Sequence, residues 1–162
     1  MNESELKVTI GASREDVWEV LFTQYGDIHI HNPTMDSSHY MHDALKGELD
    51  SARHVQFNDK LYLEEKIADV DEGNSFTVVS TEHNLPFLNT MSATYQLSSI
   101  EPELTEVRMT SQNSTSPGFM IYLLRGQLRR SLAKHLFGLK YYVETGKTVN
   151  RDNYSEVFEA YA

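Results

Sequence analysis

Residues 116–146 read SPGFMIYLLRGQLRRSLAKHLFGLKYYVETG and contain the longest regular pattern in the chain. Apolar residues recur there every three or four positions, the spacing of one face of an α-helix. They are Ile121, Leu124, Leu128, Leu132, Leu136, Leu139 and Val143. Ser116 and Pro117 fit an N-cap followed by proline at the first helical position, and Gly146 fits a C-terminal cap. We therefore predict one helix, about 40 Å long, that must lie across a sheet.

This predicted helix has two further properties. Gly126 and Gly138 interrupt its pattern, which indicates a bend or a close backbone approach. Residues 117–147 carry six basic side chains and one acidic, whereas residues 1–116 carry seven basic and twenty acidic. Two interpretations of the charge remain open: a solvated face that complements the acidic remainder, or a surface that attracts an anionic ligand or membrane.

The whole chain has 162 residues, no cysteine and a formal net charge of −10. This length favours a single domain, 1–162, with a core over about 5–146 and a C-terminal tail at 147–162. Without cysteine there is no disulfide framework, zinc ribbon or thiol nucleophile, and no glycine-rich phosphate loop occurs. No apolar run is long enough to span a membrane, the N-terminus does not resemble a secretory signal, and the acidic balance disfavours nucleic acid. We expect a cytoplasmic protein without a cofactor.

The N-terminal segment predicts a strand followed by a short helix. Leu6, Val8 and Ile10 alternate with polar residues, as in a strand with one buried face. Ser13 begins a stretch that resembles a helix N-cap, and apolar residues follow at helical spacing. These residues are Val17, Trp18, Val20 and Leu21.

Between the two helical regions the chain is rich in short β-type runs separated by turn residues. The predicted strands are 35–41, 52–57, 61–69, 75–83, 90–99 and 105–113. Because the connections are short, consecutive strands must be antiparallel. The pattern predicts a six-stranded meander.

Several short motifs occur along the chain in a fixed order. They are VTI at 8–10 with SREDVW at 13–18, AR at 52–53, LEEKI at 63–67, SFTVV at 75–79, LPF at 85–87 and GLKYYVE at 138–144. Together with the order of elements, they resemble the START-like, or SRPBCC, superfamily, and within it the polyketide cyclase/dehydrase-like branch. The chain lacks that family's glycines near Arg53, and its turn at 57–60 is too short for the gating loop of the plant hormone receptors, so hormone sensing is not expected.

The resemblance implies an α+β helix-grip fold. In this fold a curved antiparallel sheet of about seven strands wraps around the long C-terminal helix, with short helices after the first strand. Many relatives hold an apolar or amphipathic small molecule in a cavity between sheet and helix. We expect such a cavity here, reached near 83–88 and 29–33.

Glu65 is the residue most suggestive of chemistry. If Leu63, Glu65 and Ile67 face inward by alternation, Glu65 is a carboxylate among apolar neighbours and could bond a ligand or act in acid–base catalysis. A structural ion pair with Arg53 or Lys66 explains Glu65 as well, as does a register in which Glu64 points inward. By alternation and by the resemblance, the other expected lining residues are Phe76, Val78, Ser80, Met91, Ala93, Tyr95, Met109, Leu124 and Leu128.

Four of the seven histidines cluster within fourteen residues: His29, His31, His39 and His42. With Asp36 or Asp43 they could form a metal site, but the spacing matches no established metal motif, so we expect no metal. We expect His29, together with His83, to lie at the cavity mouth, where an imidazole can bond a polar ligand group.

Three function classes follow from the sequence. The first is a binding module, a carrier or sensor of a lipid-, steroid- or polyketide-like molecule. The second is a cyclase, aromatase or dehydratase-type enzyme that uses Glu65, Tyr95 and a mouth histidine. The third, by resemblance, is a chaperone-activator-like interaction module. Because the sequence has no signature of a catalytic triad, a metal site or a cofactor site, we favour the binding module over the enzyme. We expect a monomer or homodimer whose partner is a small molecule.

Overall fold

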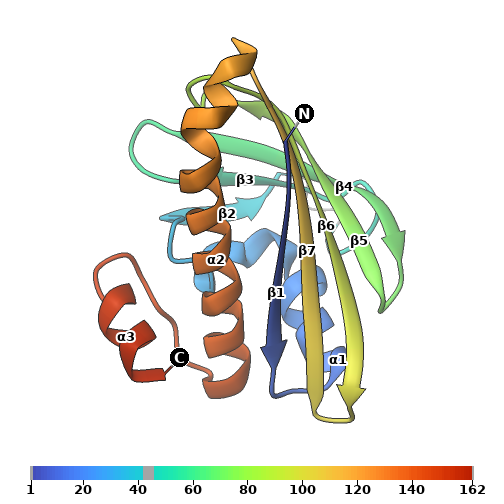
Figure 1. The fold of residues 1–162 in the computed structure, drawn as a ribbon. Coiled ribbons are helices and arrows are strands. Elements are labelled where there is room, and N and C mark those ends of the chain that lie inside the picture. Colours follow the sequence, from blue (N-terminus) through green and yellow to red (C-terminus); the bar gives the residue numbers. More distant parts are fainter. Residues whose placement is uncertain (1, 42–45, 162) are drawn as a thin grey trace.

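The computed structural model describes residues 2–41 and 46–161. Seven strands form one antiparallel sheet in the order β1-β7-β6-β5-β4-β3-β2. The strands are β1 Asn2–Ile10, β2 Ser37–Tyr40, β3 Ala52–Gln56, β4 Tyr62–Asp71, β5 Ser75–His83, β6 Leu88–Glu101 and β7 Leu104–Thr115. Figure 1 shows the sheet curving around the long helix α2, Ile121–Thr145. The predicted meander is confirmed, with strand β1 added beside β7.

Short helical segments follow β1. Helix α1, Arg14–Trp18, starts at Ser13, whose hydroxyl accepts a hydrogen bond from the backbone N–H of Asp16 at 3.1 Å. It continues into one π-helical stretch, η1 Glu19–Thr23, and after it one 3₁₀ stretch, η2 Tyr25–Ile30. The short helix predicted after the first strand is confirmed, and these segments contact strands β2, β3, β6 and β7 of the sheet.

The long helix begins later than the sequence predicted. Pro117 has an extended backbone and lies outside the helix, and the chain enters α2 through a 3₁₀ turn, η3 Gly118–Met120. The N-cap expected at Ser116 is not formed, because neither η3 nor α2 has a side-chain cap, and the Thr115 hydroxyl instead donates to the carbonyls of Pro117 and Gly118. The C-terminal prediction is confirmed: Gly146 adopts the left-handed conformation and caps the helix.

Gly138 makes the predicted close backbone approach. A Cβ atom at this position would overlap the backbone carbonyl of His31, so only glycine lets α2 lie directly on the segment after η2. Gly126, in contrast, faces open space apart from the end of the Arg130 side chain. The contact at Gly138 therefore fixes the C-terminal half of α2 against the body.

The hydrophobic core lies below this half of α2. Trp18 stacks on Phe22 at 4.4 Å between ring centroids, and both rings meet Phe76 edge-on. On α2 itself, the fully buried residues are confined to 135–139. The N-terminal half of α2 does not press on the sheet, and this separation leaves space between them.

The basic side chains of α2 divide between structural contacts and solvent. Arg129 and Lys140 donate to the backbone carbonyls of Glu5 and Thr9 on edge strand β1. The basic side chains of α2 thus complement the acidic remainder of the chain partly by donating to backbone oxygens at the open edge of the sheet. Arg125 lies over the ring of Tyr122 and is exposed.

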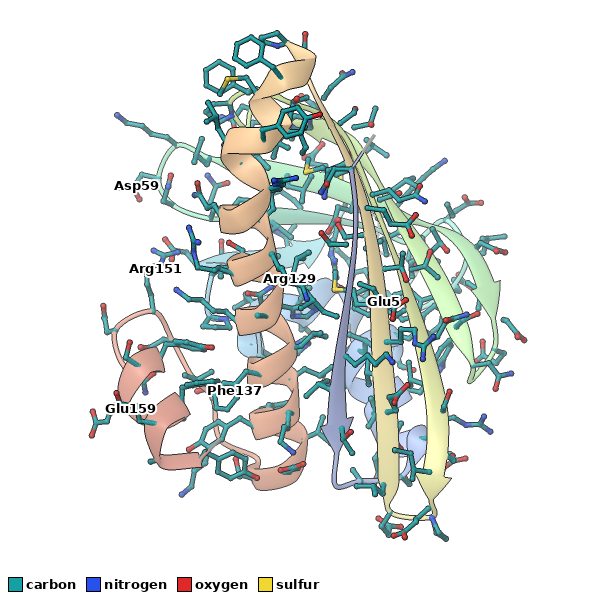
Figure 2. The ribbon with its side chains drawn as sticks, viewed as in Figure 1. Glu5, Asp59, Arg129, Phe137, Arg151 and Glu159 are labelled. Atoms are coloured by element: carbon teal, nitrogen blue, oxygen red, sulfur yellow. The ribbon has the colours of Figure 1, made fainter. Side chains whose placement is uncertain are left out.

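The C-terminal tail folds back on its own domain. Helix α3, Tyr154–Tyr161, packs beside α2 (Figure 1), and its aromatic rings surround Phe137, which Figure 2 labels on α2. Arg151 donates to the backbone carbonyls of Thr34 and Phe57 at 2.9 and 2.8 Å. In the described ranges no helix has both the length and the apolarity needed to cross a membrane.

Candidate functional site

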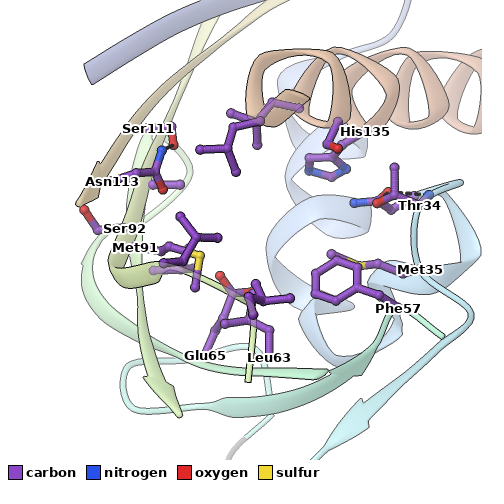
Figure 3. Close-up of a pocket in the computed structure, with 18 of the residues that line it drawn as sticks. Thr34, Met35, Phe57, Leu63, Glu65, Met91, Ser92, Ser111, Asn113 and His135 are labelled. Atoms are coloured by element: carbon purple, nitrogen blue, oxygen red, sulfur yellow. Dashed lines mark hydrogen bonds between the residues drawn. The ribbon is translucent and has the colours of Figure 1, made fainter. Parts of the chain in front are cut away.

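The space between the N-terminal half of α2 and the sheet is a cavity of about 570 Å³. Figure 3 shows His135 on α2 facing into it, with Glu65 and Leu63 on the opposite wall and Met35 and Phe57 beside them. Nine of the residues expected from the sequence line this cavity: Leu63, Glu65, Val78, Met91, Ala93, Tyr95, Met109, Leu124 and Leu128.

The other five expected residues lie elsewhere. Ile67 and Phe76 belong to the hydrophobic core below the cavity. The hydroxyl of Ser80 accepts a hydrogen bond from the backbone N–H of Met91. The imidazole of His83 bonds the backbone of Leu85 and Asn89 within the β5–β6 loop, and His29 lines a separate polar hollow near Arg151.

Strands β3 and β4 place a buried ion pair in the cavity wall. Arg53 and Glu65 are directly opposite in the strand register, and the regular alternation of β4 turns the Glu65 side chain inward together with Leu63 and Ile67. The Arg53 guanidinium donates from Nη2 and Nε to Oε1 of Glu65 at 2.7 and 3.1 Å. It also donates from Nη1 to the backbone carbonyl of Tyr25. The guanidinium carbon lies 3.9 Å from the centre of the Tyr25 ring. The interpretation of Glu65 as an ion-pair partner of Arg53 is therefore confirmed.

This ion pair leaves one acceptor free. Both hydrogen bonds from Arg53 go to Oε1, and among the described residues none donates to Oε2 of Glu65. A carboxylate has about four lone-pair sites, so Oε2 can accept further bonds. Glu65 lines the cavity, and a ligand hydroxyl or amide can reach this oxygen from there.

A second polar pair spans the cavity between β6 and α2. The hydroxyl of Tyr95 lies 3.0 Å from Nε2 of His135, and the tautomer decides which group donates. Burial lowers the pKa of His135 to about 3, and the positive charge of Arg53 adds to this effect. Burial also raises the pKa of Tyr95. Both groups are therefore uncharged near neutral pH.

Sequence reasoning missed several polar residues of the wall. The buried ones are Asn32, Ser111, Asn113 and His135, and Arg53 was expected only as a partner of Glu65 and not as a lining residue. All five line the cavity. Two signals were available. His135 lies seven residues after Leu128 and thus on the same helix face, and Arg53 alternates with Val55 along a strand. For Asn32, which lies in a loop, the sequence carries no such signal.

The cavity opens between the β5–β6 loop and α2. Its lining residues with exposed side chains are Pro86, Phe87 and Gln127. Leu85 and Leu88 complete the loop's contribution to the wall. An opening near 83–88 was expected, and it is formed by the apolar residues of that segment rather than by His83.

Three of the four clustered histidines lie apart from one another in the described part of the chain. His29 bonds Ser38, His31 stacks on His135, and His39 stacks on His54. His42 and Asp43 lie outside the described residues. Within residues 2–41 and 46–161, no three histidine or carboxylate side chains are arranged to hold a metal ion.

The buried imidazole of His135 makes the fold sensitive to acid. The pKa of His135 is about 3 in the folded state, below the usual 6.5 of an imidazole. The stability that the neutral, buried ring gives the fold is therefore complete above pH 6.5 and is lost as the pH falls toward 3. When the pH is lowered from about 7 to about 4.5, the free energy of unfolding should fall by about 3 kcal/mol less in His135→Gln than in the wild type, because the variant lacks this imidazole. Urea unfolding at both pH values measures this. The exposed His39→Gln variant serves as control, and an equal acid response of wild type and His135→Gln would contradict the burial of this ring.

Solved structures with the same architecture confirm the fold. An aromatase/cyclase from a Streptomyces species aligns with a TM-score of 0.67 at 16% identity, over 91% of this chain and 99% of its own. Norcoclaurine synthase from Thalictrum flavum aligns with a TM-score of 0.71 at 14% identity, over 89% and 94%. That synthase has also been solved in complex with dopamine and hydroxybenzaldehyde. An uncharacterised protein from Bacillus thuringiensis aligns with a TM-score of 0.65 at 16% identity, over 88% and 98%.

These similarities show the helix-grip fold that the sequence motifs had indicated. At these identities they extend to the fold alone. No protein-family model matches the chain, and no curated protein matches it either.

Proposed function

We propose that this protein binds an uncharged amphipathic small molecule in the cavity between α2 and the sheet, as a carrier or sensor. The observation that carries the proposal is a buried ion pair, Arg53–Glu65, in the wall of an otherwise largely apolar cavity, in which no described residue donates to Oε2 of Glu65. Such a space with a few convergent polar groups is the usual form of a small-molecule site. A helix-grip protein that holds two small aromatic molecules supports the same use of this fold.

The charges in the wall favour a neutral ligand. Arg53 and Glu65 cancel each other, so the cavity offers no net charge to an anion or a cation. A ligand carboxylate at Oε2 would place two negative charges together in a poorly solvated site, which is costly. A hydroxyl group can instead donate to Oε2. Long-chain alcohols, sterols and polyketides with hydroxyl groups have this chemistry.

An enzymatic function of the cyclase or dehydratase type is less well supported. Acid–base catalysis is most efficient when the pKa of the catalytic group lies near the working pH. In the cavity, burial moves the pKa of His135 to about 3 and that of Tyr95 upward, so neither transfers protons readily near neutrality. Glu65 is held by Arg53. These groups suit hydrogen bonding to a ligand better than proton transfer.

Competition for an environment-sensitive apolar fluorophore tests the proposal. At neutral pH, a medium-chain alcohol should displace the fluorophore about tenfold better than the carboxylic acid of equal chain length, a difference of about 1.4 kcal/mol. Glu65→Gln leaves the positive charge of Arg53 uncompensated in the cavity wall, so in this variant the acid should displace the fluorophore better than the alcohol. The matched control is Glu64→Gln, whose carboxylate bonds His54 instead of Arg53. Equal displacement by alcohol and acid in all three proteins would refute the role of the ion pair, and no displacement at all would refute the site.

A further inference from the structure

Four large apolar side chains gather at the end of the molecule where the cavity opens. We call them the apolar tip: Phe87, Phe119, Tyr122 and Leu123, which are 50%, 63%, 69% and 69% exposed. The β5–β6 loop and the start of α2 are joined there, because the backbone N–H of Ser116 donates to the carbonyl of Phe87 at 2.9 Å. Figure 1 shows this end of α2 opposite the β6–β7 hairpin. A contiguous exposed apolar surface of this kind marks an interaction site.

The backbone at Phe87 is strained. Its φ of +66° lies in the left-handed region, which a bulky side chain rarely adopts. The strained conformation places a large ring half in solvent at the rim of the cavity, where it contributes little burial to the fold. Strain of this kind persists where function selects it.

The charge pattern around the tip identifies the partner. Residues 84–90 and 114–124, which form the tip and its flanks, contain no charged side chain. Arg125 adjoins the tip, with its guanidinium over the Tyr122 ring, and Arg130 lies five residues further along α2, with the end of its side chain near Gly126. Both are exposed, and within the described residues neither forms an ion pair. An uncharged aromatic and aliphatic surface bordered by cations is the pattern of proteins that insert into the interface of an anionic bilayer.

We infer that the apolar tip docks on an anionic lipid surface, with Phe119 and Leu123 inserted among the acyl chains and Arg125 and Arg130 at the headgroups. The tip contains Phe87, a residue of the cavity rim, so a docked molecule presents the opening of its cavity to the bilayer. Self-association through the same surface would bring the arginines of two copies together, which is unfavourable. The inference goes beyond the proposed function because docking does not require an occupied cavity.

Co-sedimentation of the full chain with lipid vesicles tests the inference. We expect binding to vesicles of equimolar phosphatidylcholine and phosphatidylglycerol, and weaker binding to phosphatidylcholine alone. The double variant Phe119→Ser with Leu123→Ser should lower the partition coefficient at least about tenfold, since two large apolar side chains leave the acyl region. Each of Arg125→Gln and Arg130→Gln should lower it about fivefold on the anionic vesicles only.

Two further variants separate docking from folding and from ligand binding. Phe87→Gly relieves the strained backbone, so we expect unchanged or higher thermal stability together with weaker vesicle binding. Ala93→Trp alters the cavity wall and not the tip, so it should keep vesicle binding even where it loses small-molecule binding. The control Ile100→Ser removes an equally apolar side chain, 52% exposed, from the opposite end of the sheet and should bind as the wild type does.

Three results would overturn the inference. The first is absence of wild-type binding to the anionic vesicles. The second is equal binding by the tip variants and Ile100→Ser. The third is a wild-type dimer in solution that the Phe119→Ser and Leu123→Ser variant dissociates, without vesicle binding by either protein, because the tip would then be a subunit interface.

Discussion

Arg53→Met should lower the free energy of unfolding by about 3–5 kcal/mol, the usual cost of removing one partner from a buried ion pair. The substitution leaves the Glu65 carboxylate buried without its counter-charge and removes the donor to the carbonyl of Tyr25. It also removes the guanidinium from the face of the Tyr25 ring. Equilibrium unfolding in urea at neutral pH measures the loss.

Two comparisons show whether burial causes this loss. The double variant Arg53→Met with Glu65→Leu removes both charges, and we expect it to recover most of the stability because no isolated charge remains. Arg108→Met breaks a half-exposed contact with Glu106 on the sheet and should change stability by less than about 1 kcal/mol. A loss at Arg53 as small as that at Arg108 would mean that Glu65 is solvated rather than enclosed in the cavity wall.

The fold was predictable because its elements bury their apolar residues with a regular period. The stripe from Ile121 to Val143 gave the long helix, and alternation gave the strands to within about two residues. The observed elements differ from the predicted ones where contacts with the rest of the fold override the local sequence preference. Pro117 fits the first turn of a helix, yet it lies only two residues after the end of β7 and keeps an extended backbone. Met35 lies in the loop before β2, where it lines the cavity instead of pairing in the sheet.

The candidate site was predictable only in part, for a related reason. Alternation placed Leu63 and Glu65 on the inner face, and the ion pair with Arg53 was one of several open interpretations. Sequence periodicity does not show where packing is incomplete, so it cannot separate Ile67, which is core, from Leu63, which lines the cavity. That distinction depends on the contact at Gly138, which holds only one half of α2 against the body.

The gap beneath α2 also explains why the polar residues of the cavity were hard to assign. His135 reads as one member of a helical stripe and could equally be a satisfied core residue. In the structure it bonds Tyr95 across 40 positions of sequence, a contact that no local pattern predicts. The site is therefore a property of the assembled sheet and helix, and its chemistry follows from side chains that each belong to a regular element.

Ala93 offers the most direct test of the central claim, which is that the space beneath α2 holds a small molecule. Ala93 is a buried, small residue of the cavity wall on β6, between Val78 on the neighbouring strand and Ser111 on the other. Ala93→Trp places an indole ring in the space that a ligand would occupy. Gln96→Trp adds the same ring to the exposed outer face of the same strand.

The measurement is a fluorescence titration of wild type, Ala93→Trp and Gln96→Trp with an environment-sensitive apolar probe, after circular dichroism has shown that all three are folded. We predict saturable binding by the wild type and by Gln96→Trp, and none by Ala93→Trp. Binding of the probe by folded Ala93→Trp with the affinity of the wild type would contradict the claim, because the probe would then occupy some other part of the molecule.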